Sequence, residues 1–287
     1  MTGQGQGARD ILIGIDPERE WHLPLAWAAD EAHLRHLPVR LVLAVPPQHD
    51  THHVDDTPRQ TALRRAGTDR LEQARDWVRE RHPELGMTTD LRGGFPAAVI
   101  AGSAGHARMV VLGSRHLGRV AEVLSAGSLV VPVTAQAPCP VVVVGDAPHT
   151  TQQPPYIVAG IDGSAASTTA LQFAFDAADL RGAEVRAISV WQPPVFLLHD
   201  EEVALQAHRA LLAECTAGLS EKYPDVRLTH EVPIGHPVEE LAEAAEHALA
   251  VVVGRRGRGG YTGMRLGSTV HGLLHRAHCP VITVPER

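Results

Sequence analysis

A glycine-rich segment near the end of the chain carries the clearest chemical signal in this sequence. It begins at Gly254, directly after an apolar run, and continues through Gly257 to Gly267 and Ser268. Glycines let backbone N–H groups approach an anion closely. Ser268 and Thr269 open an expected helix whose free N–H groups and dipole favour negative charge. The pattern predicts a polyphosphate cradle built mainly from backbone.

Two common nucleotide motifs are absent from the sequence. The pattern G-x-x-x-x-G-K-[ST] does not occur, and the one lysine, Lys222, lies far from any glycine-rich loop. No G-x-G-x-x-G follows the first expected strand. The glycine-rich segment is therefore neither a Walker P-loop nor an ordinary dinucleotide fingerprint.

The chain repeats itself, which indicates a duplicated domain. The recurring landmarks come in the same order: Ile11–Asp16 and Ile157–Asp162, Gly94–Pro96 and Gly235–Pro237, Val110–Gly113 and Val251–Gly254, Gly127–Ser128 and Gly267–Ser268, and Cys139–Val144 and Cys279–Val284. The polar, proline-rich segment 147–155 joins the two copies, as a linker does. We predict a first domain over residues 1–146 and a second over residues 156–287.

Strands and helices are expected to alternate within each copy. In the second copy we expect strands at 156–161, 185–191, 227–232, 249–253 and from 281, and helices at 164–180, 201–223, 238–247 and 268–276. Continuous apolar strands joined through helices predict a parallel sheet buried on both faces. Each domain is therefore expected to be a doubly wound α/β layer with a five-stranded parallel sheet, which binds ligands beyond the carboxyl ends of its strands.

Composition narrows the class of protein. A net charge of -7 over 287 residues argues against a general nucleic-acid binder. No apolar run approaches the ~18 residues that a membrane helix needs, and the polar N-terminus lacks a signal-peptide core. We expect a cytoplasmic protein without nucleic-acid or membrane partners. Its 3 cysteines are widely spaced and are expected to be small buried core residues, not a disulfide framework.

The spacing Gly254-x2-Gly257-x9-Gly267-Ser268 resembles the ATP-binding signature of the universal stress protein family, whose fold is adenine nucleotide alpha hydrolase-like. Further marks of that family are Gly-Ile-Asp-Gly-Ser at 160–164, Gly235-x-Pro237, and a Cys-Pro pair before the last strand. By this resemblance, Ile161 and Val190 line an adenine pocket, and Asp162 faces the ribose or the phosphate–metal region. The residues that would bracket the ribose and hold the phosphates of ATP, bound with magnesium, are Val253, Gly254, Gly257, Gly267, Ser268 and Thr269.

Arginines in the same segment have two interpretations. Arg256 and its neighbours Arg255, Arg258 and Arg265 are not required by the motif. They either supplement the charge that holds phosphate or form a solvated face of the loop.

The first domain departs from the pattern. It keeps the counterparts Asp16, Gly113, Gly127 and Ser128. However, His116 stands where the second glycine should be, and the rigid Pro17 follows Asp16. We expect this domain to bind nucleotide weakly or not at all, unless Gly118 replaces the missing glycine through a shifted loop.

Neither a metal site nor a catalytic residue is predicted. Two histidine groups were considered as metal ligands and are expected to be ordinary polar surface: His271, His275 and His278, and the run His49, Asp50, His52, His53, Asp55 and Asp56. The expected function is a nucleotide-dependent regulatory module in the stress response, with a homodimer or an unidentified protein as partner and the two halves paired with each other. The alternatives are an interaction protein without nucleotide binding and a slow ATPase.

Overall fold

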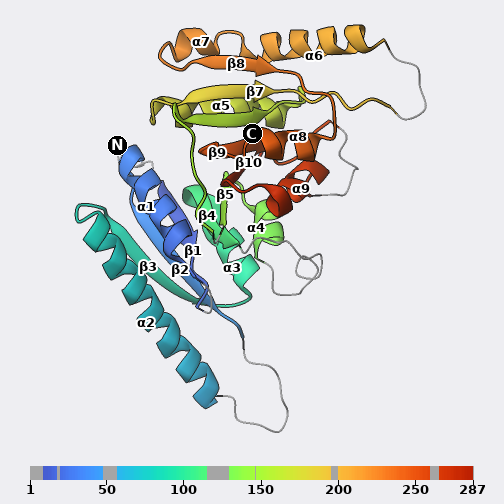
Figure 1. The fold of residues 1–287 in the computed structure, drawn as a ribbon. Helices are drawn as coiled ribbons and strands as arrows, with labels where there is room; N and C mark the ends of the chain where they lie inside the picture. Colours follow the sequence, from blue (N-terminus) through green and yellow to red (C-terminus); the bar gives the residue numbers. More distant parts are fainter. Residues whose placement is uncertain are drawn as a thin grey trace, which may run out of the picture. The chain divides into compact units, whose positions relative to one another are not determined.

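The computed structural model describes residues 9–17, 20–47, 57–114, 129–145, 147–194, 200–258 and 265–286. The chain divides into two compact units (Figure 1). One comprises residues 1–114 and 136–146, and the other comprises residues 115–135 and 147–287.

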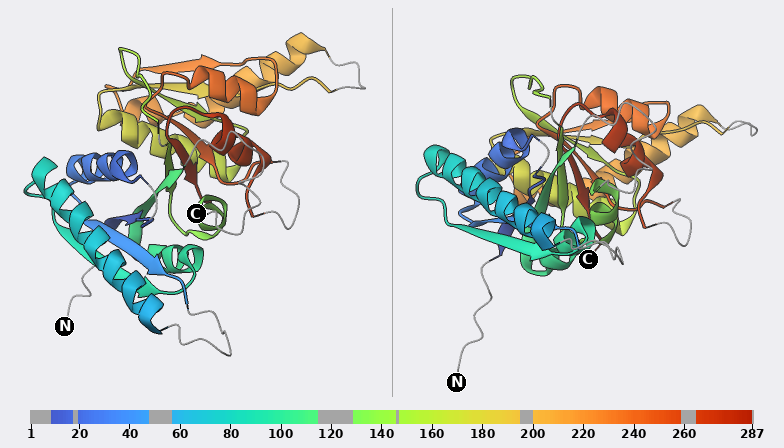
Figure 2. Two further views of the ribbon diagram at one scale, coloured as in Figure 1. Left: turned by 60° about the horizontal axis from the view of Figure 1, so that its bottom comes forward. Right: turned by 90° about the horizontal axis from the view of Figure 1, so that it is seen from below.

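The first unit contains parallel strands in the order β3-β2-β1-β4-β5. Their bounds are β1 Asp10–Gly14, β2 Val39–Val45, β3 Met87–Gly93, β4 Ala107–Ser114 and β5 Val141–Gly145. Its helices are α1 His22–Arg35, α2 Thr57–Arg81, α3 Pro96–Ser103 and the 3-10 turn Ala104–His106. Helix α4 Val130–Gln136 precedes β5 in the chain and, apart from Gln136, is part of the second unit. Helices α1 and α2 contact each other over the strands, as Figure 2 shows, and α3 packs on β2.

The second unit repeats this order as β8-β7-β6-β9-β10, again with parallel neighbours. Its strands are β6 Tyr156–Gly160, β7 Glu184–Ile188, β8 Leu228–Glu231, β9 Ala250–Gly254 and β10 Val281–Val284. Its helices are α5 Ala165–Asp179, α6 Glu201–Thr216, α7 Leu219–Lys222, α8 Pro237–Ala244 and α9 Ser268–Arg276. The predicted fold class, tandem doubly wound α/β domains with five-stranded parallel sheets, is confirmed.

The central strands are buried on both faces. Every residue of β6, β10 and the segment 250–253 of β9 is buried, and so are Ile11, Leu12 and Ile13 in β1. Apolar side chains on both sides of a strand require cover on both sides. The β6–α5–β7 and β8–α8–β9 crossovers run in opposite directions across the sheet, so right-handed connections place α5 and α8 on opposite faces.

Local signals explain where α5 begins and ends. Ser164 caps it, since its hydroxyl oxygen accepts a hydrogen bond from Ser167 N at 3.1 Å. Gly182 follows the helix with φ +57°, a left-handed conformation that glycine adopts without strain.

Three predicted element bounds were wrong. The helix expected over 238–247 ends at Ala244. The single helix expected over 201–223 is broken into α6 and α7, because Gly218 adopts φ +78° and interrupts the helix. The strand expected to reach Trp191 ends at Ile188, and Trp191 makes only an isolated parallel bridge with Ile234.

The cysteines differ in burial. Cys139 and Cys279 are buried, and that burial raises the pKa of their thiols to about 11 and about 12. Cys215 is only partly buried, which corrects the expectation of a core residue, because it lies on α6 at the edge of the sheet layer. Among the described residues, no helix combines the length and the apolar character that crossing a bilayer requires.

Candidate functional site

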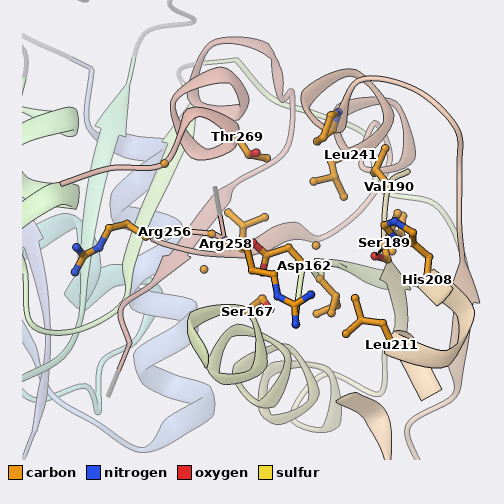
Figure 3. Close-up of a pocket in the computed structure, with 18 of the residues that line it drawn as sticks. Asp162, Ser167, Ser189, Val190, His208, Leu211, Leu241, Arg256, Arg258 and Thr269 are labelled. Atoms are coloured by element: carbon orange, nitrogen blue, oxygen red, sulfur yellow. Dashed lines mark hydrogen bonds between the residues drawn. The ribbon is translucent and has the colours of Figure 1, made fainter. Parts of the chain in front are cut away.

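A pocket of about 840 Å³ lies within the second unit at the carboxyl edge of its sheet. It lies beyond the ends of β6, β7 and β9, and the starts of α5, α8 and α9 and one face of α6 complete its walls (Figure 3). Strands β6 and β9 are neighbours whose connecting helices lead away in opposite directions. This is the switch point at which doubly wound sheets place their ligands.

The structure brings together every site residue predicted in the second domain. The residues that line the pocket include Ile161, Asp162, Val190, Val253, Gly254, Arg256, Gly257, Gly267, Ser268 and Thr269. In the first domain, Asp16 follows β1 and Gly113 lies near the end of β4. Gly127 and Ser128 fall outside the described residues, as do His116 and Gly118.

Gly254 allows β9 and α5 to approach each other. A Cβ at this position would lie 2.8 Å from the carbonyl carbon of Ala166 and 2.8 Å from Ser167 N. These atoms belong to the backbone of the first turn of α5 and cannot rotate away. The glycine is therefore required by the packing of the strand against the helix, before any ligand is considered.

The two described ends of the glycine-rich loop are tied to the sheet. Arg255 N donates a hydrogen bond to Val284 O at 2.8 Å, and Gly267 N donates one to Arg255 O at 2.9 Å. The second bond brings the start of α9 beside the end of β9. A methyl group at Gly267 would make only ordinary contacts, at 3.4 Å from Arg255 O and 3.8 Å from Gly257 N.

The N-terminus of α9 offers uncapped backbone donors to the pocket. Gly267 is its N-cap, with φ −71° and ψ 151°, and among the described residues no side chain caps the helix. The N–H groups of Ser268, Thr269 and Val270 have no carbonyl partner within the helix, and all three residues line the pocket. Such an end attracts anions through its donors and its dipole.

Asp162 organises the loop from the opposite side. Its Oδ1 accepts hydrogen bonds from Ser164 N at 3.0 Å and Ser164 Oγ at 2.6 Å, and its Oδ2 accepts one from Arg258 N at 2.9 Å. Burial raises the pKa of this carboxyl, but the hydrogen bonds from Ser164 and Arg258 outweigh burial and hold the pKa below its ordinary value. A Cβ at Gly257 would collide with Oδ2, so a larger residue there would have to displace this carboxylate from its hydrogen bond with Arg258 N.

The far side of the pocket is apolar with one polar pair. Val190, Leu211 and Leu241 lie on the side away from the loop (Figure 3). Beside them Ser189 Oγ and His208 Nδ1 are hydrogen-bonded at 2.8 Å, and burial lowers the pKa of His208. An apolar wall with a few placed polar groups is the usual lining of a small-molecule site.

Sequence reasoning missed the contribution of α6. Its pocket residues include Ala207, Ala210, Leu211 and Glu214, which recur at the spacing of one helical face. That stripe was visible in the sequence, but it also fits an ordinary core face. Only the fold shows that this face covers a pocket.

The arginines of the loop do not act alike. The Arg258 side chain lies near Asp162, and the Arg256 side chain points away from Asp162 (Figure 3). Arg256 therefore contributes to the wall without directing its charge at the pocket centre.

The first unit differs at the matching positions. A Cβ at Gly113 would lie 3.1 Å from the side chain of Pro24, where Gly254 faces bare helix backbone. Helix α1 has no side-chain cap at its N-cap residue Trp21. Instead Glu20 Oε1 accepts hydrogen bonds from Trp21 N at 3.0 Å and His22 N at 3.1 Å, which places a carboxylate at the start of the helix.

Comparison with known proteins agrees with this geometry. The model of the universal stress protein family matches residues 7–145 and 156–285. The chain belongs to this family. Its tandem organisation follows from the two matched segments.

Two relatives align with this chain over almost their whole length. A universal stress protein of Mycolicibacterium smegmatis is 36% identical, over 96% of this chain and 97% of that protein. One of Mycobacterium tuberculosis is 32% identical over 98% of both. Among solved structures, a universal stress protein from Archaeoglobus fulgidus superposes with a TM-score of 0.69 over 96% of both chains, at 15% identity, which shows a shared fold.

Proposed function

We propose that the second domain binds ATP, with magnesium, and that this universal stress protein acts as a nucleotide-dependent regulatory module in the stress response. One observation carries the proposal: the uncapped start of α9, the glycine loop and an apolar slot meet in a single pocket of about 840 Å³. That volume falls within the range of about 300–1,000 Å³ usual for small-molecule sites.

The phosphates would lie at the loop end of the pocket. The free N–H groups of Ser268, Thr269 and Val270 supply donors there, and the hydroxyls of Ser268 and Thr269 add two more. Hydrogen bonds to charged groups contribute about 1.5–3 kcal/mol each. A backbone cradle of this kind needs no lysine, which agrees with the sequence of this loop.

The adenine would lie at the apolar end. The apolar contact area at that end comes from Ile161, Val190 and Leu211. The hydrogen-bonded pair Ser189 and His208 lies beside them and could form a hydrogen bond with a ring nitrogen or the amino group of adenine. The ribose then spans the middle of the pocket, near Asp162 and Val253.

Magnesium would be held mainly by the phosphates and water. Both oxygens of Asp162 already accept hydrogen bonds, so the Asp162 carboxylate orders the loop and does not serve as a free ligand. Magnesium bound to nucleotides commonly keeps several waters and phosphate oxygens as ligands.

The residues of the site favour regulation over turnover. Hydrolysis needs a positioned base near the γ-phosphate. Three described lining residues could act as a base. Asp162 is bonded to the Arg258 N–H, His208 is bonded to Ser189 at the end away from α9, and Glu214 lies on α6 and not on α9, where the phosphates are proposed to bind. Binding would instead place phosphate charge at the start of α9, which changes the surface that a partner or a second copy meets.

For the first domain we propose weak binding or none. Pro24 stands against Gly113 in the first domain, whereas Gly254 faces bare helix backbone in the second. The first domain also has His116 at the position of the loop's second glycine, which removes a close backbone approach to phosphate.

Calorimetric titration of nucleotide-stripped full-length protein with Mg-ATP tests the proposal. We expect about one site per chain. Gly267→Ala should weaken binding about 10- to 100-fold, because its methyl group would stand at the start of α9 beside the Ser268 and Thr269 donors, and each lost charged hydrogen bond is worth about 1.5–3 kcal/mol. Gly105→Ala is the matched control, since a Cβ there meets nothing within 4 Å.

Each other outcome has a defined meaning. Two sites per chain would show that the first domain binds nucleotide through its altered loop. No binding, with the protein folded, would favour the interaction protein without nucleotide. Equal affinities for the wild type and Gly267→Ala would place the nucleotide elsewhere.

A further inference from the structure

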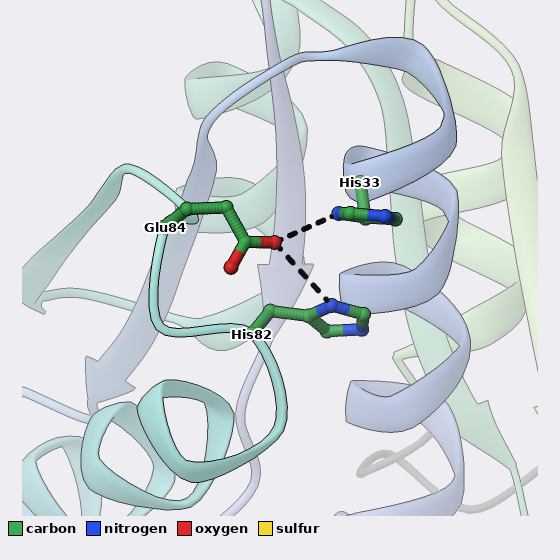
Figure 4. A group of neighbouring side chains, drawn as sticks. All are labelled: His33, His82 and Glu84. Carbon is green, nitrogen blue, oxygen red and sulfur yellow. Dashed lines mark ion pairs between the residues drawn. The ribbon is translucent and has the colours of Figure 1, made fainter.

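Three side chains with metal-ligating groups converge in the first unit, far along the chain from the glycine loop. They are His33, His82 and Glu84 (Figure 4). One nitrogen of each ring and one carboxylate oxygen all lie within 4.8 Å of one another. A small adjustment of side-chain torsions would bring three such atoms within about 2.0–2.2 Å of a common centre, which is the bond length of zinc to nitrogen and oxygen ligands.

The backbone holds these residues in place. His33 lies in the last turn of α1, which ends at His36 in the left-handed conformation. His82 and Glu84 belong to a turn directly after α2, closed by a hydrogen bond from Leu85 N to His82 O at 3.1 Å. Pro83 occupies the second position of that turn, where its fixed φ is favoured. Helices α1 and α2 contact each other, so the three side chains meet on a rigid scaffold.

A carboxylate fixes the far side of one imidazole ring. His82 Nε2 is hydrogen-bonded to Asp30 Oδ1 at 2.8 Å, and Arg81 holds both oxygens of Asp30 at 2.9 Å. The Asp30 carboxylate therefore selects the tautomer with the proton on Nε2. The other ring nitrogen, Nδ1, lies 3.8 Å from Glu84 Oε1. Histidines that bind metals commonly have a carboxylate on the other ring nitrogen in this way.

The electrostatics of the cluster favour a cation. The carboxylates of Asp30 and Glu84 lie on either side of His82, and the Arg81 guanidinium is the cation paired with Asp30. The two imidazole rings stack with centroids 4.8 Å apart and an interplanar angle of 24°. His33 Nδ1 lies 2.9 Å and His82 Nδ1 lies 3.8 Å from the same oxygen, Glu84 Oε1, so one cation could contact all three groups.

We propose that His33, His82 and Glu84 form a zinc site, with Asp30 as the residue that positions His82. Two imidazole nitrogens and one carboxylate oxygen suit Zn²⁺, whereas Mg²⁺ and Ca²⁺ prefer oxygen ligands alone. The side chains of His33 and Glu84 are 49% and 60% exposed, so water can reach the fourth position of a tetrahedral ion. Such a site would clamp the end of α1 to the turn between α2 and β3.

The other histidine groups weighed from the sequence do not form a comparable cluster among the described residues. The rings of His271 and His275 lie 4.9 Å apart, but no third ligand joins them in the described part of the chain. His49, His52 and His53 fall outside the described residues. The zinc experiment must therefore assign the site by substitution and not by stoichiometry alone.

The test is a calorimetric titration of metal-free, untagged full-length protein with zinc chloride. His33→Ala and Glu84→Gln should each lower the affinity of one site at least tenfold. Asp30→Asn should lower it by about 10- to 100-fold, the usual cost of losing the partner of a metal-bound histidine. His106→Ala is the matched control, because it removes an exposed histidine of the same unit.

Circular dichroism keeps the result interpretable, since His33 and Glu84 are exposed enough to be replaced without loss of packing. Zinc should raise the melting temperature of the wild type and of His106→Ala, and magnesium should not. Unchanged zinc affinity in both His33→Ala and Glu84→Gln would overturn the proposal and leave an ion-pair cluster that needs no metal. Equal effects of zinc and magnesium would also overturn it.

Discussion

The packing of Gly254 against α5 makes a quantitative prediction for Gly254→Ala. Its Cβ would stand 2.8 Å from two backbone atoms of α5, and ordinary contact begins at 3.4 Å, so the strand and the helix must separate by about 0.6 Å. Overpacking of this kind costs about 1–3 kcal/mol. Alanine recovers about 0.4–1 kcal/mol by restricting the unfolded chain. We expect a net loss of about 1–2 kcal/mol in the free energy of unfolding of the second domain.

The assay should report the second domain separately, because a chain with two compact units need not unfold in one step. Hydrogen exchange of peptides from α5 and β9 at increasing urea concentrations does this in the intact protein. The free energy of unfolding of a domain falls by about 1–3 kcal/mol per M of urea, so the urea concentration at the unfolding midpoint should fall by about 0.5–1 M in Gly254→Ala. Peptides from β1 and β2 in the first unit provide an internal reference.

Gly267→Ala is the matched comparison for this experiment. A methyl group there makes ordinary contacts of 3.4 Å or more, so the urea midpoint should stay within error of the wild type while ATP affinity falls. An unchanged midpoint for Gly254→Ala would refute the argument that this glycine is required by helix packing. A large loss of stability in Gly267→Ala would refute its assignment to the ligand.

Two further predictions concern the turn between β6 and α5. Asp162→Asn should cost about 1 kcal/mol at neutral pH, because an amide group would then face the N–H of Arg258. The pKa of Asp162 is lowered on folding, so the stability that its carboxylate contributes is present above the unfolded value of 3.8 and is lost as pH falls through the lower folded value. Urea unfolding should therefore show the stabilities of the variant and the wild type converging below about pH 4. Asp225 is exposed, so Asp225→Asn is a control that should show no cost at neutral pH. Ser164→Ala should lower the melting temperature of the second domain by about 2–6 °C, because it removes the hydrogen bond that caps Ser167 N at a cost of about 1 kcal/mol. A calorimetric scan that finds no shift in the melting temperature would contradict the role of Ser164 as a helix cap.

The sequence was sufficient for the fold and for the loop side of the pocket. Internal repeats and continuous apolar strands predict two doubly wound domains, and Gly254, Gly257 and Gly267 locate the loop after the fourth strand of the second domain. These signals are local in the chain. They need only the periodicity of each element and the rule that ligands bind at the switch point.

The rest of the candidate sites depends on distances that the sequence does not contain. His208 contacts Ser189, which lies 19 positions earlier in the chain, and His33 contacts His82 although strand β2 and helix α2 separate them in the sequence. Each of these histidines lies on an amphipathic helix or in a turn, where an exposed polar residue is the ordinary expectation. Only the packing of α6 over the pocket, and of α1 against α2, brings them to their partners.

The two domains together show that the glycine motif combines two separate requirements. The glycine near the end of the fourth strand is required by the packing of the strand against a helix. Gly254 lies against α5, and its counterpart Gly113 lies against Pro24 of α1. Gly257 and Gly267 instead surround the anion side of the pocket, beside Asp162 and the start of α9. The first domain keeps Gly113 and has His116 in place of the second glycine. This is the pattern expected of a domain that retains the packing of the fold without the constraint of a nucleotide, and it is why titration should find about one ATP per chain.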